Sequence, residues 1–374
     1  MSLDVIQCIL SDIKGSSRVF VVGSYRNNEI TPYHPLRTFI DKIEEGQVVS
    51  TKIHLEGLKA ADVNLLLSDT LGLFPRITRS LSIAIQRKTE GNPFYVLEFI
   101  KSLVERNLLN YSPRERRWVW DEGKIGSEQI SENVSELLAQ KMSNIPEERQ
   151  RALKIASCFG TSIRNDVVSS MNEVAEYSFL GRELECAYAA GFLERDIQSS
   201  GYKFAHDKVR EAAYCQMTDY EQKRLHYDIG QVLLDNSAGL VTDKKLFLCA
   251  DQINRGLTII SAPEEILKVI QMNHNAASVA LKACDFTAAH RYAKTALKLA
   301  GEGNLSADYD RISFIMANAA CACGRYDEAT NAIESILQHE DSLEEKLKFD
   351  VYDLKITMVS CHSGSQHVQL LHAF

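Results

Sequence analysis

The sequence contains no run of 18 apolar residues, and its N-terminus has no basic stretch ahead of an apolar one. A membrane helix needs about 20 consecutive, mainly apolar residues, and a secretory signal needs both of those N-terminal features. We therefore expect neither a membrane span nor a signal peptide, and we predict a cytoplasmic protein.

An excess of positive charge is also missing, because 42 Lys and Arg face 50 Asp and Glu and give a net charge of −8. Nucleic acids and anionic membranes attract basic surfaces, so we expect neither as a partner, although a local basic patch is compatible with this total. The nine cysteines are irregularly spaced, and Cys321 and Cys323 stand too close for a CxxC pair. Free thiols in a reducing compartment, with no metal site, are therefore expected.

What is present is ordinary globular composition, with 45% apolar and 25% charged residues. A length of 374 residues predicts two or three domains. Residues 2–14 and 36–43 have helical periodicity, whereas 19–22 and 48–55 resemble strands of a parallel sheet that is buried on both faces. Two strands cannot bury both faces of such a sheet, so we expect the remaining strands to precede Met1.

The next segment predicts helices over 60–71, 75–88 and 93–106, a β-hairpin from 108–111 and 117–120, and a linker over 121–131. Four further helices are expected near 131–142, 147–157, 164–171 and 177–189, followed by a two-stranded wing from 192–196 and 202–204. This order indicates a winged helix. Residues 129–217 hold ten basic and thirteen acidic side chains, which disfavours DNA binding.

Beyond residue 218 the pattern is helical and repeats at a spacing of forty positions. Ala277, Phe286, Ala289, Ala293 and Ala296 correspond to Ala317, Tyr326, Ala329, Ile333 and Ile336. Small residues where helices cross and an aromatic after each turn predict a solenoid of the tetratricopeptide type, which residues 227–256 are expected to join. The tail over 363–374 is expected to fray.

Three short segments could carry chemistry, and each also has a structural explanation. Arg26 follows the first expected strand, where an Arg can bind a terminal phosphate or simply cap the strand. The Gly91–Asn92–Pro93 turn is either helix punctuation or a rigid edge beside an adenine ring. His206 stands where a strand meets a helix, as a ligand or as a satisfied capping residue.

In this order and spacing, the segments resemble the signal-transduction ATPases with numerous domains (STAND NTPases). The similarity is greatest to the AAA/Orc1-like predicted-ATPase modules attached to histidine kinases, serine/threonine kinases and nucleotide cyclases. It extends from residue 2 to about residue 300, and the matching phrases are residues 21–29, 34–36, 90–99, 118–121 and 204–214.

The resemblance implies a role for three residues. Arg26 would contact the γ-phosphate, Pro93 would pack on adenine, and His206 would sense the β-phosphate of ADP, with Tyr25, Asn92 and Asp207 supporting them. In the related Met-His-Asp motif of plant immune receptors, this chain has Ala205 in place of Met.

One departure from the family bears on catalysis. The sequence has no Gly-x-x-x-x-Gly-Lys-Ser/Thr loop and no acidic Mg²⁺-binding strand, and phosphoryl transfer depends on both. We therefore expect no catalytic residue, no certain cofactor and no ATP hydrolysis by this polypeptide alone. ADP or ATP with Mg²⁺ is implied only for the complete family architecture.

The expected fold is mainly α. Its parts are a truncated α/β NTPase remnant (1–58), a helical lid (59–107), a hairpin and linker (108–128), a winged helix (129–217), tetratricopeptide-like repeats (218–362) and a tail (363–374). The leading hypothesis is a regulatory nucleotide switch and protein-interaction scaffold that binds partner proteins through its repeats. The alternatives are a scaffold with a degenerate NTPase half, and a split ATPase that a P-loop polypeptide completes in trans. Kinase or cyclase domains are further expected partners.

Overall fold

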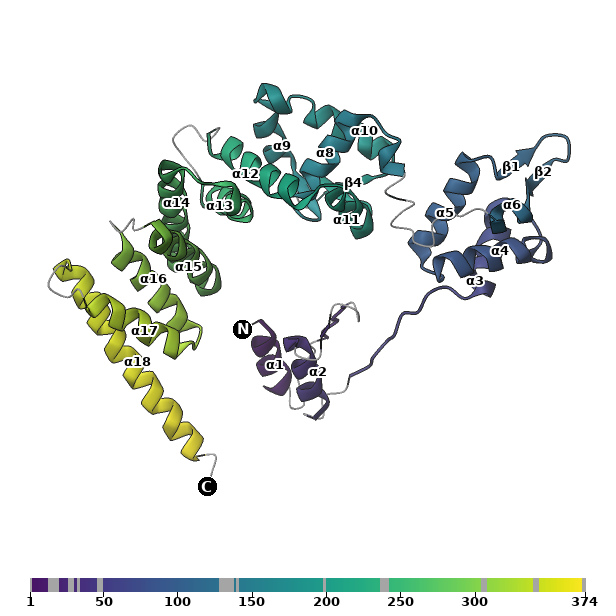
Figure 1. Ribbon diagram of the computed structural model, residues 1–374. Coiled ribbons are helices and arrows are strands. Elements are labelled where there is room, and N and C mark those ends of the chain that lie inside the picture. Colours follow the sequence, from purple (N-terminus) through teal and green to yellow (C-terminus); the bar gives the residue numbers. More distant parts are fainter. Residues whose placement is uncertain are drawn as a thin grey trace. The chain divides into compact units, whose positions relative to one another are not determined.

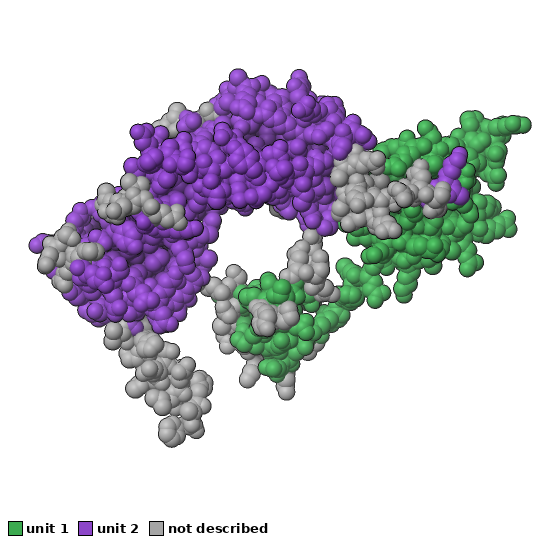
Figure 2. All heavy atoms as spheres, viewed as in Figure 1, with its two compact units in different colours: residues 1–122 green, residues 123–374 purple. Residues whose placement is uncertain are grey.

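The computed structural model describes residues 2–12, 20–25, 30–31, 34–45, 50–127, 138, 141–197, 200–235, 242–303, 308–338 and 343–371. The chain divides into two compact units, residues 1–122 and 123–374 (Figures 1 and 2). The described part is mainly helical and contains a two-stranded and a three-stranded antiparallel sheet. No helix of this part is both long and apolar enough to cross a membrane.

At the N-terminus, α1 (Ser2–Asp12) and α2 (Pro35–Glu45) form where helices were expected. The predicted strands are wrong at the described positions, because residues 20–22 and 50–55 have no regular structure. Four of their large apolar side chains are 78–90% exposed, namely those of Phe20, Val22, Ile53 and Leu55. A strand forms only when a neighbour pairs with its backbone N–H and C=O groups, and neither segment has such a neighbour among the described residues.

The rest of the first unit consists of α3 (Ala60–Leu71), α4 (Pro75–Thr89), α5 (Pro93–Glu105) and the antiparallel strands β1 (Leu109–Ser112) and β2 (Arg117–Trp120). The next helix, α6 (Glu122–Ser127), begins at the last residue of the first unit. Pro75 and Pro93 each occupy a first helical turn, where the missing N–H costs nothing. The three helices and the hairpin agree with the sequence prediction. The linker expected over 121–131 is wrong at 122–127, which form α6.

After α6, the second unit contains α8 (Glu147–Ser157), β3 (Ser162–Arg164), α9 (Asn165–Asn172), α10 (Leu180–Ala189), β4 (Leu193–Asp196), β5 (Gly201–Phe204) and α11 (Asp207–Cys215). The strands pair in the order β3-β5-β4. The sequence predicted only the β4–β5 hairpin, because the three residues of β3 are too few to show an alternating pattern. Of the helix expected over 131–142, only Leu138, Lys141 and Met142 lie among the described residues.

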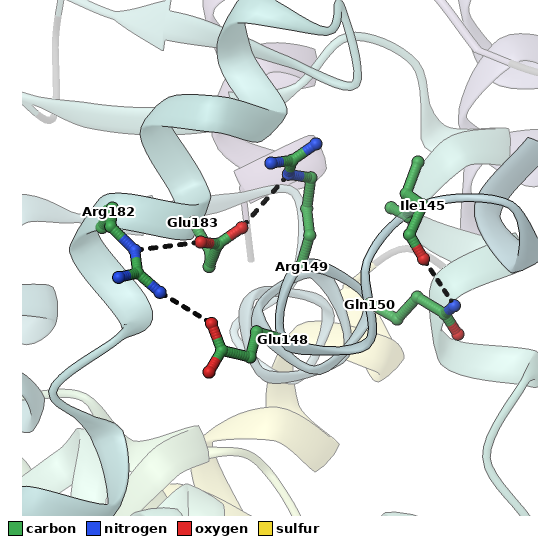
Figure 3. A network of polar contacts seen from close by, with 6 residues as sticks. All are labelled: Ile145, Glu148, Arg149, Gln150, Arg182 and Glu183. Atoms are coloured by element: carbon green, nitrogen blue, oxygen red, sulfur yellow. Dashed lines mark hydrogen bonds and ion pairs between the residues drawn. The ribbon is translucent and has the colours of Figure 1, made fainter.

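A buried carboxylate holds α10 against α8 (Figure 3). Glu183 is 6% exposed and accepts hydrogen bonds from Nε of Arg149 at 3.2 Å and from Nε of Arg182 at 3.0 Å. Arg182 also binds Glu148 on α8 at 2.6 Å. The two helices are therefore joined by paired charges in addition to their apolar contacts.

The remaining helices form an array of α12 (Asp219–Asp235), α13 (Asp243–Arg255), α14 (Pro263–Lys282), α15 (Phe286–Gly303), α16 (Tyr309–Ala322), α17 (Tyr326–Leu337) and α18 (Glu345–Leu371). In the hairpins α14–α15 and α16–α17, the repeated alanines Ala277, Ala289, Ala317 and Ala329 are completely buried. Small residues at these positions let the helices approach closely, as the forty-residue spacing predicted. The frayed tail predicted over 363–374 is wrong up to Leu371, where α18 ends.

Candidate functional site

His206 stands between β5 and α11 as the N-cap residue of that helix. Its backbone is extended (φ −155°, ψ 148°), and its Nδ1 accepts a hydrogen bond from the backbone N–H of Lys208 at 3.1 Å. A ring nitrogen that accepts a hydrogen bond carries no proton, so Nε2 carries the proton of the neutral ring. The half-buried side chain therefore has a donor at Nε2, the polarity that a phosphate oxygen requires.

The backbone before His206 is fixed by hydrogen bonds to residues that flank β3 and β4. The N–H of Phe204 donates to the carbonyl of Thr161 at 2.9 Å, and the N–H of Ala205 donates to the carbonyl of Phe192 at 3.1 Å. Asp207 begins α11, where a negative charge interacts favourably with the helix dipole. The position of the His206 ring is thus determined by both the strand before it and the helix after it.

At the other end of α11, Tyr214 joins a buried polar network. Its hydroxyl lies 3.0 Å from Nε2 of His226 on α12, and Nδ1 of His226 lies 2.6 Å from Oε1 of Gln252 on α13. The amide nitrogen of Gln252 donates to the carbonyl of Cys158 at the end of α8, at 3.1 Å. Arg255 donates to the same carbonyl at 3.4 Å. Four helices therefore meet at one network.

The network fixes the protonation state of His226. Because the Gln252 nitrogen donates to Cys158, the Gln252 oxygen must accept, so Nδ1 of His226 carries the proton and Nε2 accepts from the Tyr214 hydroxyl. Burial lowers the pKa of His226, and the charge of Arg255 lowers it further, while the hydrogen bond to Gln252 acts in the opposite direction. The neutral imidazole is the form that this site stabilises.

The described cysteines are free thiols, and the most buried ones are poor nucleophiles. Burial raises the pKa of Cys158 to about 12 and that of Cys249 to about 11. Both are therefore protonated at neutral pH. No group of three His, Cys, Asp or Glu side chains that could hold a metal ion occurs within the described ranges.

The Gly91–Asn92–Pro93 turn connects α4 to α5. The Asn92 side chain caps α5 by accepting from the N–H groups of Phe94 and Tyr95, at 3.1 and 3.4 Å, and the exposed Pro93 begins the helix. The carbonyl of Gly91 accepts from the N–H of Leu58 at 2.7 Å, so the turn also holds the segment that leads into α3. Asn92 has a structural task, and Pro93 presents its ring to solvent.

The other candidates are placed as follows. Arg26 lies outside the described residues. Tyr25 is 48% exposed and belongs to no helix or strand. Asn92 and Pro93 belong to the first unit, and His206 and Asp207 belong to the second. Asn92 and Pro93 therefore stand at the start of one helix and His206 and Asp207 at the start of another, and the two helices belong to different units.

Sequence reasoning missed Tyr214, His226 and Gln252. A signal for His226 was present, because it shares a helical stripe with the buried Ile229 and Leu233. Gln252 likewise lies in phase with the buried Cys249 and Ile253. A polar side chain on an apolar stripe must find a partner when it is buried, and the sequence does not show that the two partners are each other.

No family model matches the chain. A curated relative, the hybrid signal transduction histidine kinase G of Dictyostelium discoideum, is 25% identical over an alignment of 345 residues, and the alignment covers 79% of this chain. The chain spans 10% of the length of that relative. The similarity is distant, and it links most of this chain to part of a signalling protein.

Among solved structures, one similar protein is a signal-transduction ATPase with numerous domains from Pyrococcus horikoshii, which has a tetratricopeptide-repeat sensor. It is 15% identical, with a TM-score of 0.35, and the match covers 84% of this chain and 46% of that one. A TM-score at this level does not establish a shared overall fold.

Proposed function

We propose that the chain is a regulatory module of the STAND type, part of a signalling protein in which a bound nucleotide controls an array of protein-binding helices. In this proposal residues 129–217 are a winged helix, and 218–362 are tetratricopeptide-like repeats that bind partner proteins. The distant similarity to a hybrid histidine kinase over 79% of the chain supports a place in signal transduction.

The observation that carries this proposal is the geometry of His206. The backbone N–H of Lys208 donates to Nδ1, so the proton is on Nε2, and the ring stands at the start of α11. The Nε2–H group at this positive end of the helix dipole is a donor that a phosphate oxygen can accept from. We propose that His206 donates to the β-phosphate of ADP and thereby favours the ADP-bound state of the switch.

The described side chains do not fit Mg²⁺ and a triphosphate in a catalytic arrangement. The sequence has no Gly-x-x-x-x-Gly-Lys-Ser/Thr loop, and the described residues contain no cluster of metal-binding side chains. The backbone N–H cradle, the lysine and the metal ligands supply most of the stabilisation in phosphoryl transfer. We therefore propose binding and regulation, with no hydrolysis by this polypeptide alone.

Titration calorimetry with ADP tests the proposal. We expect a dissociation constant of about 10 µM or tighter, equivalent to about −7 kcal/mol, and a loss of at least tenfold in His206→Ala. His34→Ala is the matched control, because Nδ1 of His34 likewise accepts a backbone N–H, that of Leu36 at 3.2 Å, ahead of α2. Equal losses in both variants, or no binding by the unaltered chain, would contradict the proposed role of His206.

A second candidate function is a protein-binding scaffold with a degenerate nucleotide half. The regular hairpins α14–α15 and α16–α17, with fully buried alanines at their crossings, favour it because such arrays present extended surfaces to partners. This function requires no nucleotide. Absence of ADP binding, together with an intact helical array in hydrogen exchange, would support the scaffold over the switch.

A third candidate is a split ATPase completed in trans. It is favoured by the exposed apolar side chains of residues 20–22 and 53–55, which a neighbouring sheet would cover. An apolar fluorescent dye should bind these segments in the isolated chain, and Phe20→Ser combined with Ile53→Ser should reduce that binding. If the double variant binds the dye as strongly as the unaltered chain, these segments are not an available sheet surface.

A further inference from the structure

We propose that Tyr214, His226 and Gln252 are positioning residues that hold α11, and with it His206, in a fixed orientation relative to the α12–α13 hairpin. This inference deepens the proposed function and rests on it for the role of His206. It gives a role to a buried polar network that neither the capping of α11 nor the packing of the repeats requires.

The helix α11 depends on its neighbours for stability. The helix has nine residues, and helices of this length are not stable in water without tertiary contacts. Its C-terminal end is held by the Tyr214 hydroxyl on His226 and by the side chain of Gln222, which donates to the carbonyls of Tyr214 and Met217 at 3.1 and 3.2 Å. Both anchors come from α12.

Beyond His226, the network continues through Gln252 of α13 to the end of α8. His226 is 1% exposed and Gln252 is 3% exposed, and every ring nitrogen and amide atom in the network has an assigned partner. Gln252 connects α13 to the carbonyl of Cys158, which lies at the end of α8. The contacts therefore form a continuous path through α11, α12, α13 and α8, on both sides of the domain boundary expected at residue 218.

The helix α13 also contacts the repeats that follow it. Asp251 accepts from Nη1 of Arg291 at 2.6 Å and from the hydroxyl of Tyr292 at 2.9 Å, both on α15. Asn254 and Asn273 of α14 exchange two hydrogen bonds, at 2.8 and 2.9 Å. Because Gln252 lies between Asp251 and Asn254, side-chain contacts of α13 reach both the repeat array and, through His226, the helix that His206 caps.

Amide hydrogen exchange in the full chain tests the positioning directly. The N–H of Lys208 is bound to His206 Nδ1, so its exchange rate reports on the cap. We expect Tyr214→Phe and Gln252→Leu each to speed exchange at residues 208–210 by about tenfold, because each leaves a buried polar group unpaired. Tyr220→Phe is the matched control, since Tyr220 is 66% exposed.

Two readouts separate positioning from general loss of stability. The amide of Leu153 in α8 should keep its exchange rate in both variants, and nitrogen NMR should show the Nδ1–H form of His226 in the unaltered chain and a changed ring signal in both variants. Unchanged exchange at Lys208, or an equal rise at Leu153, would overturn the proposal.

Titration with ADP then tests the positioning by this network and the proposed function separately. We expect Tyr214→Phe to weaken ADP binding by about fivefold to tenfold while Tyr220→Phe leaves it unchanged. If the unaltered chain binds ADP and Tyr214→Phe binds it equally well, the positioning of His206 through this network is refuted. If the unaltered chain binds no ADP, the proposed function fails, and the exchange rate of Lys208 still decides whether the network positions α11.

Discussion

Gly91 occupies a backbone position that no other residue can take without rearrangement. Its φ is +74°, and a Cβ there would lie 2.1 Å from the carbonyl oxygen of Leu58. We expect Gly91→Ala to destabilise the first unit by about 3 kcal/mol or more, because the left-handed backbone and the backbone clash both oppose a side chain. Thermal unfolding followed by circular dichroism measures this loss.

Gly72→Ala separates the two causes. Gly72 also has a positive φ, +62°, but a Cβ there would meet nothing within 4 Å. Its replacement should cost only the conformational term, about 1 kcal/mol. If both variants lose the same stability, the close approach of Leu58 to Gly91 does not contribute.

His226 should make the second unit less stable in mild acid. Its pKa in the folded protein is lowered by burial, so the unfolded chain binds the proton more readily and protonation favours unfolding. The stability it contributes is complete above about pH 6.5 and falls as the pH decreases below that value. The pKa of His274 is lowered by the same cause, so the unaltered chain must be compared with His226→Gln.

The expected result is that urea unfolding curves of the two proteins differ most near neutral pH and approach one another toward about pH 5. The reason is that His226→Gln loses the network at every pH, whereas the unaltered chain gives up its advantage only when the ring must accept a proton. Curves that remain separated by the same amount across this range would show that His226 is not the titrating group.

At the scale of elements, Glu183 should be the strongest polar link between α8 and α10. It is 6% exposed and paired with Arg149 and Arg182, so Glu183→Ala leaves the half-buried Arg149 guanidinium without its partner. We expect a loss of about 2 kcal/mol. Glu176→Ala is the control. Glu176 pairs with Arg151, but its side chain is 64% exposed, so this pair should contribute less than about 1 kcal/mol to the stability of the second unit.

Urea unfolding of the second unit, followed by far-ultraviolet circular dichroism, measures the stability of both variants. A larger loss for Glu176→Ala than for Glu183→Ala would contradict the assignment. Such a result would mean that the apolar contacts between α8 and α10 are sufficient and that the buried carboxylate is tolerated without stabilising the pair.

The elements that the sequence predicted well are those whose pattern is local. The helices α3 to α5 and those of the α14–α17 hairpins follow from apolar periodicity, and Pro75, Pro93 and Asn92 mark helix starts by their own chemistry. The runs over 19–22 and 48–55 failed because a strand depends on a partner that the run itself does not specify. The strand β3 was missed because Ser162–Arg164 is stabilised by pairing with β5.

The candidate site divides in the same way. The cap at His206 follows from a histidine between a strand and a helix, so the sequence located it. The Tyr214–His226–Gln252 network joins residues up to 38 positions apart, or 94 when Gln252 is taken to Cys158, and only the fold brings them together. Any property that depends on this network therefore required the structure.

At the scale of the whole molecule, the net charge is concentrated in one unit. Residues 1–122 contain 16 basic and 15 acidic side chains, whereas 123–374 contain 26 and 35. The second unit, with His206 and the helical array, therefore carries a net charge of −9. Electrostatic attraction favours neutral or basic partner surfaces for this unit.

The division into two compact units predicts two separate unfolding transitions, because each unit has its own buried core. Gly91→Ala should lower only the transition of the first unit, and Glu183→Ala only that of the second. The double variant should show both shifts without interaction, since mutations without shared partners are additive within about 0.5 kcal/mol. Scanning calorimetry of the four proteins tests this prediction. A single transition that both variants shift equally would show that the two units unfold as one cooperative body.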